Sequence, residues 1–170
     1  IATILREAGN EHVYGIIVFD EGKNNQTDNI IVLGSGNRYS IENYIFDPVL
    51  VGMLLLREKY ITANDTGIHE LLYNDVNTHS KENLQKLADY VAANVKSQTT
   101  ITDEDRKTCE MLNGIQLEIP AWYLMHQGHA LEALLIKAFP KLNDIKKNKE
   151  EKLKLAIIEK VIDDFPILIA

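Results

Sequence analysis

The sequence predicts a single α/β domain over residues 1–170, with a small, partly parallel sheet near its N-terminal end and a helical C-terminal half. The length fits one ordinary domain, and 45% hydrophobic with 25% charged residues is the composition of a soluble globular protein. Two short apolar runs rich in β-branched residues, at 13–19 and 30–33, have the pattern of strands buried on both faces. Farther along the chain, apolar residues recur at helical spacing, which indicates amphipathic helices.

Two helix starts are predicted after the second strand. Ser40 has the side chain of an N-cap, and we expect a helix over 41–46 behind it. Asp47 is expected to cap the next helix, because Pro48 suits the first helical position and the apolar run 49–56 follows it.

The middle of the chain is predicted to be helical. A short helix is expected over 66–73, and Ser80 is expected to cap a longer one. Thr102 is expected to cap a third, which contains Cys109, because acidic residues after Thr102 favour the positive end of a helix dipole. The helix after Ser80 is expected to bury one face, formed by Leu84, Leu87, Ala88, Val91 and Val95.

A strand and two helices are predicted in the last third. Apolar and polar residues alternate over 115–119, which indicates a half-exposed strand. A helix over 131–138 is expected to stop before Pro140, and a last helix is expected over 153–162. The lysines of 146–154 are interleaved with glutamates, which indicates a solvated helix face, with contact to a DNA backbone as the alternative.

Charge and cysteine content exclude several classes of protein. The formal net charge of −7 argues against a nonspecific nucleic-acid binder, but not against an enzyme whose acidic cluster holds metal ions. The single cysteine, Cys109, excludes an internal disulfide framework and a multi-cysteine zinc site. The longest apolar run, 49–56, is far shorter than a bilayer span, so no membrane partner is expected. Few cysteines and no secretory signal fit a cytoplasmic location.

Three carboxylates are candidates for a metal site. Asp20 and Glu21 directly follow the first strand, and Glu42 lies in the first turn of the helix after the second strand. Ligands of open α/β sheets bind beyond the carboxyl ends of strands about 5 Å apart, so these side chains can converge. Magnesium with few carboxylates suits phosphoryl transfer or phosphodiester cleavage. Alternatively, Asp20 and Glu21 are loop residues and Glu42 balances a helix dipole.

A second polar group contains two histidines. His126 and His129 would share one face of a helix, but a zinc site would need at least one more ligand. Gly128 favours a helix start near this point, and a helix-terminal histidine with an ordinary hydrogen bond is the alternative for His129. Trp122 can stack on a base, but a single tryptophan is expected in the core.

Residues 14–20 (YGIIVFD) and 38–48 (RYSIENYIFDP) together resemble the Toprim domain of OLD-type (overcoming lysogenisation defect) ATP-dependent nucleases. In that family a buried strand ends in Asp-x-Asp, and an Ile-Glu-Asn-Tyr segment opens a helix. Residues 119–124 and 128–132 are similar to the later part of such proteins. The resemblance implies a Toprim fold that binds Mg²⁺ or Mn²⁺ and cuts DNA, next to an ABC-type ATPase domain in the same or a partner chain, in a homo-oligomer. The family also suggests antiviral defence.

Residue by residue, the resemblance assigns metal binding to Asp20, as the second Asp of the motif, and to Glu42. Glu21 is a neighbour that could substitute, and His129 would contact a phosphate or the water at the scissile bond. Val18 stands where the family has the first Asp, and the family's upstream glutamate strand has no counterpart in this chain. We therefore expect a fragment of a larger ATPase–nuclease, or a degenerate copy of the site.

Two functions follow from these observations. The first is a metal-dependent DNA endonuclease domain of an OLD-like ATPase–nuclease, which the presence of Glu42 favours. The second is a non-enzymatic dimerisation or partner-docking module beside an ATPase domain, which Val18 favours. A flavodoxin-like or receiver-like regulatory domain is a weaker third, because the acidic pair and lysine of a receiver cannot be placed.

Overall fold

A computed structural model describes residues 4, 7–9, 15–18, 30–33, 36–69, 71–146 and 152–169 of the chain. These residues combine helices and strands, which confirms the predicted class at that level. None of the helices within these ranges has both the length and the apolar character that crossing a bilayer requires. The strands are β1 (Gly15–Val18), β2 (Ile30–Leu33), β3 (Arg106–Glu110) and β4 (Gln116–Pro120). The helices are α2 (Ile41–Ile45), α3 (Pro48–Arg57), α4 (Lys81–Lys96), α5 (Ala121–Leu124), α6 (Gly128–Ala138), α7 (Leu142–Lys146) and α8 (Lys152–Ile157), with a π-helix η3 (Ile158–Ile162) and 3₁₀ helices η1 (Ala63–Thr66), η2 (Val76–Thr78) and η4 (Pro166–Leu168).

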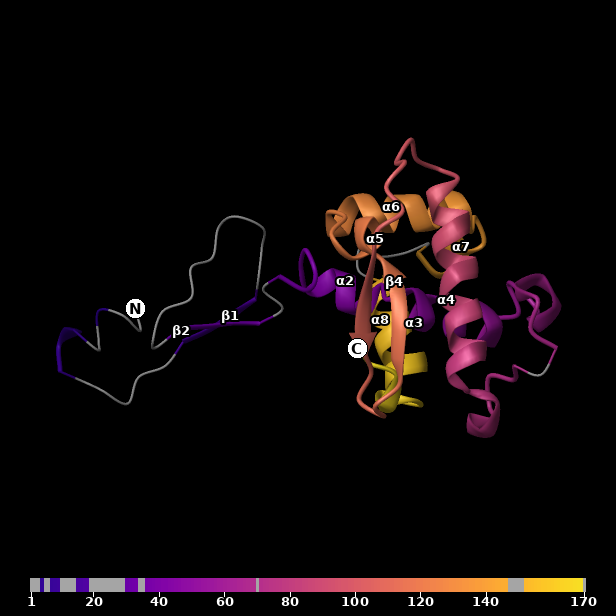
Figure 1. Ribbon diagram of the computed structural model, residues 1–170, viewed down its shortest axis with the longest axis horizontal. Helices are drawn as coiled ribbons and strands as arrows, with labels where there is room; N and C mark the ends of the chain where they lie inside the picture. Colours follow the sequence, from indigo (N-terminus) through magenta and orange to yellow (C-terminus); the bar gives the residue numbers. More distant parts are fainter. Residues whose placement is uncertain are drawn as a thin grey trace.

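The described strands form two separate two-stranded sheets. β1 and β2 run parallel, with Gly15 opposite Ile30. β3 and β4 run antiparallel, with Arg106 opposite Pro120. In Figure 1 the β1–β2 pair stands away from the helices, whereas the β3–β4 hairpin lies among them. The parallel pairing predicted for the two N-terminal strands is confirmed. In the described residues, however, β3 and β4 form a separate antiparallel sheet, so these strands do not form the parallel sheet of a Toprim-like fold.

The prediction of a helix after Thr102 is also wrong, because residues 106–110 form the strand β3. Its pairing continues beyond the strand, where the backbone N–H of Ala121 donates to the carbonyl oxygen of Asp105 at 2.7 Å. A tight turn joins β3 to β4 and contains Gly114 at a φ of 80°, a left-handed backbone conformation that suits glycine. Pairing with β4 satisfies the backbone groups of β3 that face this partner, and it overrides the helix signal of the acidic residues. Cys109 therefore lies in a strand and not in a helix.

The centre of the core lies between α3 and α4. Every residue of α3 from Pro48 to Leu55 is buried, and Gly52 permits a close approach: a Cβ there would lie 2.5 Å from Cγ of Leu87. Trp122 is 7% exposed and belongs to the same core, as predicted. The predicted face of α4 is confirmed, because Leu84, Leu87, Ala88, Val91 and Val95 are all buried.

The remaining predicted elements differ mainly at their ends. The predicted strand over 115–119 is β4, and the predicted helices over 131–138 and 153–162 correspond to α6 and to α8 with η3. The prediction of a short helix over 66–73 is wrong. Instead, the short 3₁₀ helix η1 lies earlier and ends at Gly67, whose φ of 70° interrupts helical geometry.

Candidate functional site around Glu42

The segment that resembles the nuclease family is anchored by a buried ion pair. Nη2 of Arg38 lies 2.6 Å from Oδ2 of Asp47, and both side chains are 2% exposed. Nη1 of Arg38 also donates to the backbone carbonyl of Asn43 at 2.8 Å. The other carboxylate oxygen of Asp47 accepts from the backbone N–H of Val49 at 2.9 Å and so caps α3, as predicted. Arg38 and Asp47 therefore fix the angle at which α2 leads into α3.

A second set of contacts holds α2 against the turn between α5 and α6. The side-chain amide of Asn43 donates to the carbonyl oxygen of His126 at 2.8 Å, and its oxygen accepts from the backbone N–H of Ser40 at 3.1 Å. The hydroxyl of Tyr123 donates to the carbonyl oxygen of Phe46 at 2.9 Å. Asn43 is 1% exposed and Tyr123 is fully buried, so these contacts are made inside the protein.

Glu42 lies at the edge of the buried contacts that Arg38, Asn43, Asp47 and Tyr123 make. Its Oε2 accepts from the hydroxyl of Ser40 at 2.7 Å, and its Oε1 lies 3.3 Å from Nζ of Lys154 on α8. The side chains of Glu42 and Lys154 are 21% and 16% exposed. The first residue of α6 lies directly against this glutamate, because a Cβ on Gly128 would be 2.7 Å from Cβ of Glu42. The carboxylate thus sits where α2, α6 and α8 meet.

The surroundings of Glu42 favour its ionised form. Burial raises its pKa, but the hydrogen bond from Ser40, its own backbone N–H and the charge of Lys154 all lower it, and the net effect on the pKa of Glu42 is downward. The prediction that Glu42 lies in the first turn of a helix is confirmed, with Ser40 at the N-cap position. The sequence gives no sign of Lys154 as a partner, because the two residues are far apart in the chain.

The other predicted site residues do not complete a cluster. Asp20 and Glu21 lie outside the described residues, so their convergence with Glu42 stays a prediction. His129 lies in the first turn of α6 and is exposed. The prediction that His126 and His129 share a helix face is wrong, because α6 begins at Gly128 and leaves His126 in the preceding turn.

The His126 ring packs against the protein. Its ring stands edge-on to that of Trp122, with the centroids 6.4 Å apart, and its burial lowers the pKa of the imidazole. The neighbouring Gln127 caps α6 by accepting from the backbone N–H of Ala130 at 2.7 Å. The sequence analysis did not identify Gln127 as the cap of α6, because the usual capping residues are Ser, Thr, Asp and Asn.

Residues 36–69, 71–146 and 152–169 do not by themselves provide a metal site. Within the part of the chain that the structure describes, no three His, Cys, Asp or Glu side chains are grouped closely enough to hold an ion. Glu42 supplies one carboxylate, and Lys154 already neutralises its charge. The described residues therefore do not fit Mg²⁺ or Mn²⁺. Lys154 departs from the predicted solvated lysine face, because its side chain is mostly buried against Glu42. The side chains of residues 146–152 lie outside what the structure describes, so for them the solvated face stays a prediction.

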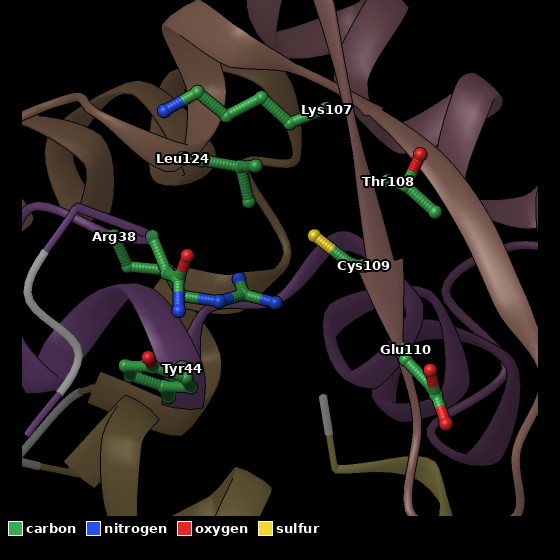
Figure 2. A pocket seen from close by; sticks show the side chains of 8 residues that line it. Arg38, Tyr44, Lys107, Thr108, Cys109, Glu110 and Leu124 are labelled. Carbon is green, nitrogen blue, oxygen red and sulfur yellow. The ribbon is translucent and has the colours of Figure 1, made fainter.

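A cavity of about 250 Å³ lies beside Arg38, between the start of α2 and β3. Figure 2 shows the thiol of Cys109 pointing toward the Arg38 side chain, with Leu124 and Tyr44 beside them. Burial raises the pKa of the Cys109 thiol, and the nearby positive charge of Arg38 opposes this only in part. The thiol is thus a poor nucleophile at neutral pH. Because residues 106–110 were expected to be helical, the sequence could not predict this cavity.

The chain was compared with models of known protein families, with curated proteins and with solved structures, and no match was found.

Proposed function

We propose that this chain is part of the DNA-cleaving region of an OLD-type ATPase–nuclease, and that Glu42 is one of its metal-binding carboxylates. The observation that supports the proposal is how the segment resembling that family is built. Arg38, Asn43 and Asp47 are buried and hold α2 in place, whereas Glu42 is presented at the rim with an ionised carboxylate. A segment of this kind supports and orients one acidic side chain.

The proposal requires ligands besides Glu42. One carboxylate opposite a lysine does not hold a divalent cation, because Mg²⁺ binds through oxygen ligands at short distances. The predicted partners are Asp20 and Glu21, which follow the first strand in the sequence. We expect DNA to be held mainly by other parts of a larger protein, since this chain has a net charge of −7.

The test compares two glutamate–lysine pairs in the full-length protein. Glu42→Gln removes the proposed ligand, and Glu58→Gln is the matched control, since Glu58 lies 2.9 Å from Lys160 in a similar, partly exposed pair. Mn²⁺ binding is measured by electron paramagnetic resonance, and DNA cleavage by nicking of supercoiled plasmid. We expect Glu42→Gln to reduce both at least tenfold and Glu58→Gln to leave both unchanged. Equal effects of the two variants, or no Mn²⁺ binding by the unaltered protein, would contradict the proposal.

A non-enzymatic docking or dimerisation module is the second candidate. Two observations favour it: Val18 stands at the first position of the acidic motif, and Lys154 pairs with Glu42. This candidate predicts that the full-length protein neither binds Mn²⁺ nor nicks DNA, and that Val18→Asp restores neither. Metal-dependent nicking by the unaltered protein would exclude it.

A further inference from the structure

The segment that follows η3 packs on the loop before α4. We call residues 163–169, which include η4, the strap. Phe165 on the strap is 8% exposed. Its ring stands edge-on to the rings of Tyr73 and His79, with the centroids 5.1 and 5.0 Å away. Phe165 therefore holds the strap on the loop through two aromatic contacts.

Polar contacts complete the attachment of the strap. The hydroxyl of Tyr73 donates to Oδ2 of Asp164 at 2.6 Å. Farther along, the carbonyl oxygen of Ile169 accepts from the backbone N–H of Leu112 at 2.9 Å. Leu112 lies in the turn between β3 and β4, so the strap connects the loop to the tip of the hairpin.

The two ring nitrogens of His79 have different surroundings. Nε2 lies 3.2 Å from the carbonyl oxygen of Leu72, which can only accept, so Nε2 carries the proton of the neutral ring. Nδ1 is buried and has no hydrogen-bond partner among the described residues. Because His79 is 6% exposed, a second proton on this ring places a charge in the protein interior.

The surroundings of His79 oppose its protonation. Burial lowers the pKa of the imidazole. The backbone groups of Leu72 and Tyr73 and the charge of Asp75, on the same loop, raise the pKa, but the net effect on the pKa of His79 is downward. The neutral ring is therefore the form that fits the closed packing.

The strap and α3 also bring charged groups to this cluster. Asp164 accepts from the hydroxyl of Tyr73, and the guanidinium of Arg57 lies 5.6 Å from the centroid of the same ring. Asp164 and Arg57 are 3.9 Å apart, so their opposite charges face each other. Burial and the hydrogen bond to Asp164 raise the pKa of Tyr73, which therefore keeps its proton. The group that the strap packs against His79 is the uncharged ring of Phe165.

We propose that His79 is a latch operated by a proton, and that protonation of its ring releases the strap from the loop and from the tip of the hairpin. When the strap opens, the ring meets water and binds a second proton without the cost of placing a charge in the interior. Protons therefore bind the open form more tightly than the closed form, and acid shifts the population toward the open form. Neither metal binding nor DNA cleavage takes part in this latch.

The direction of the pH effect follows from the two states of His79. In the open form the ring titrates near the ordinary histidine pKa of about 6.5. In the closed form its pKa is lower. The advantage of the closed strap is therefore complete above the ordinary value and is lost as pH falls through the lowered value.

Opening changes only one end of the hairpin. It uncovers Phe165 and Leu168, of which Leu168 is fully buried in the closed form. The hairpin itself stays attached, because the side chain of Gln85 on α4 accepts from the backbone N–H of Glu118 and donates to its carbonyl oxygen, each at 2.8 Å. We therefore expect acid to loosen the strap and the hairpin tip while the core around α3 and α4 stays folded.

Hydrogen exchange measured by mass spectrometry tests the latch in the full-length protein. We expect the protection factor of residues 163–169, corrected for intrinsic exchange, to fall at least tenfold from about pH 7.5 to about pH 5 in the unaltered protein. In His79→Gln the neutral amide can still donate to Leu72, so the protection factor should change less than twofold. His69→Gln removes an exposed histidine and should behave like the unaltered protein.

A second variant covers the loss of the aromatic contact in His79→Gln. His79→Phe keeps a ring against Phe165 and cannot be protonated, so its strap should also stay protected in acid. Protection that is equal at both pH values in the unaltered protein would overturn the proposal. The same holds for protection that falls as far in both His79 variants as in the unaltered protein. Neither outcome depends on the result of the nicking assay.

Discussion

Asp47 and Glu42 belong to the same short segment and carry the same charge, but the protein uses them differently. Asp47 is 1% exposed and satisfies both Arg38 and the start of α3. Glu42 keeps part of its surface exposed, and its carboxylate oxygens contact the side chains of Ser40 and Lys154 at the rim. The comparison shows that Asp47 supports the fold of this segment, whereas Glu42 keeps an accessible carboxylate.

Removing Asp47 and removing Glu42 should change the free energy of unfolding by different amounts. Removing one partner of a buried ion pair leaves the other charge without compensation, which costs about 3–5 kcal/mol. An ion pair near the surface is worth about 1 kcal/mol or less, because water and salt screen it. Stability measurements should therefore separate the two carboxylates even before any activity is known.

The largest effect is expected for Asp47→Ala. It strands the charge of Arg38 and removes the cap of α3, so the free energy of unfolding should fall by about 4 kcal/mol in urea denaturation. Asp47→Asn is the control, since an amide oxygen can still accept from Val49, and its loss should be smaller. A loss below about 1 kcal/mol for Asp47→Ala would contradict the buried ion pair as the main support.

An intermediate effect is expected for Asn43→Ala. The variant leaves the carbonyl oxygen of His126 and the backbone N–H of Ser40 without their partner, and we expect a loss of about 2–3 kcal/mol in the same denaturation experiment. Asn143→Ala on α7, an exposed asparagine, should change stability by less than about 0.5 kcal/mol. Similar losses for the two variants would mean that Asn43 does not hold α2 in place.

The smallest effect on stability is expected for Glu42→Gln, about 1 kcal/mol or less near neutral pH. The informative readout is its pH dependence. Because folding lowers the pKa of Glu42, the stability that its ionised form contributes is present above the pKa of the unfolded chain and is lost as pH falls through the lower, folded value. Thermal melts should therefore show a shallower acid destabilisation for the variant than for the unaltered protein. Parallel curves would refute the lowered pKa.

Local signals predicted the parts of the fold that local chemistry decides. Ser40, Asp47 and Ser80 are polar side chains directly before apolar runs, and α2, α3 and α4 begin where they predict. The position of Glu42 in the first turn of α2 follows from the same signal. The contact of Glu42 with Lys154 does not follow from that signal, because the packing of three helices brings Lys154 from α8 to Glu42.

Elements that depend on partners distant in the chain cannot be predicted from local signals. The acidic residues after Thr102 look like a helix start, but β4 provides a ladder that the local sequence does not reveal. The strand at 115–119 was predicted without a partner, and the structure pairs it as β4 with β3. The same division applies to the predicted site. Glu42 lies where expected in its helix, whereas the convergence of Asp20 and Glu21 with it remains a prediction.

The contact of Gln85 with β4 sets a limit on growth. A hairpin with two bare edges can add copies on both sides and extend into a fibre. Here α4 occupies one side through a glutamine that imitates a neighbouring strand at Glu118. Gln85 thereby keeps the β4 side of the hairpin from pairing with a further strand, so one side chain protects this edge against aggregation.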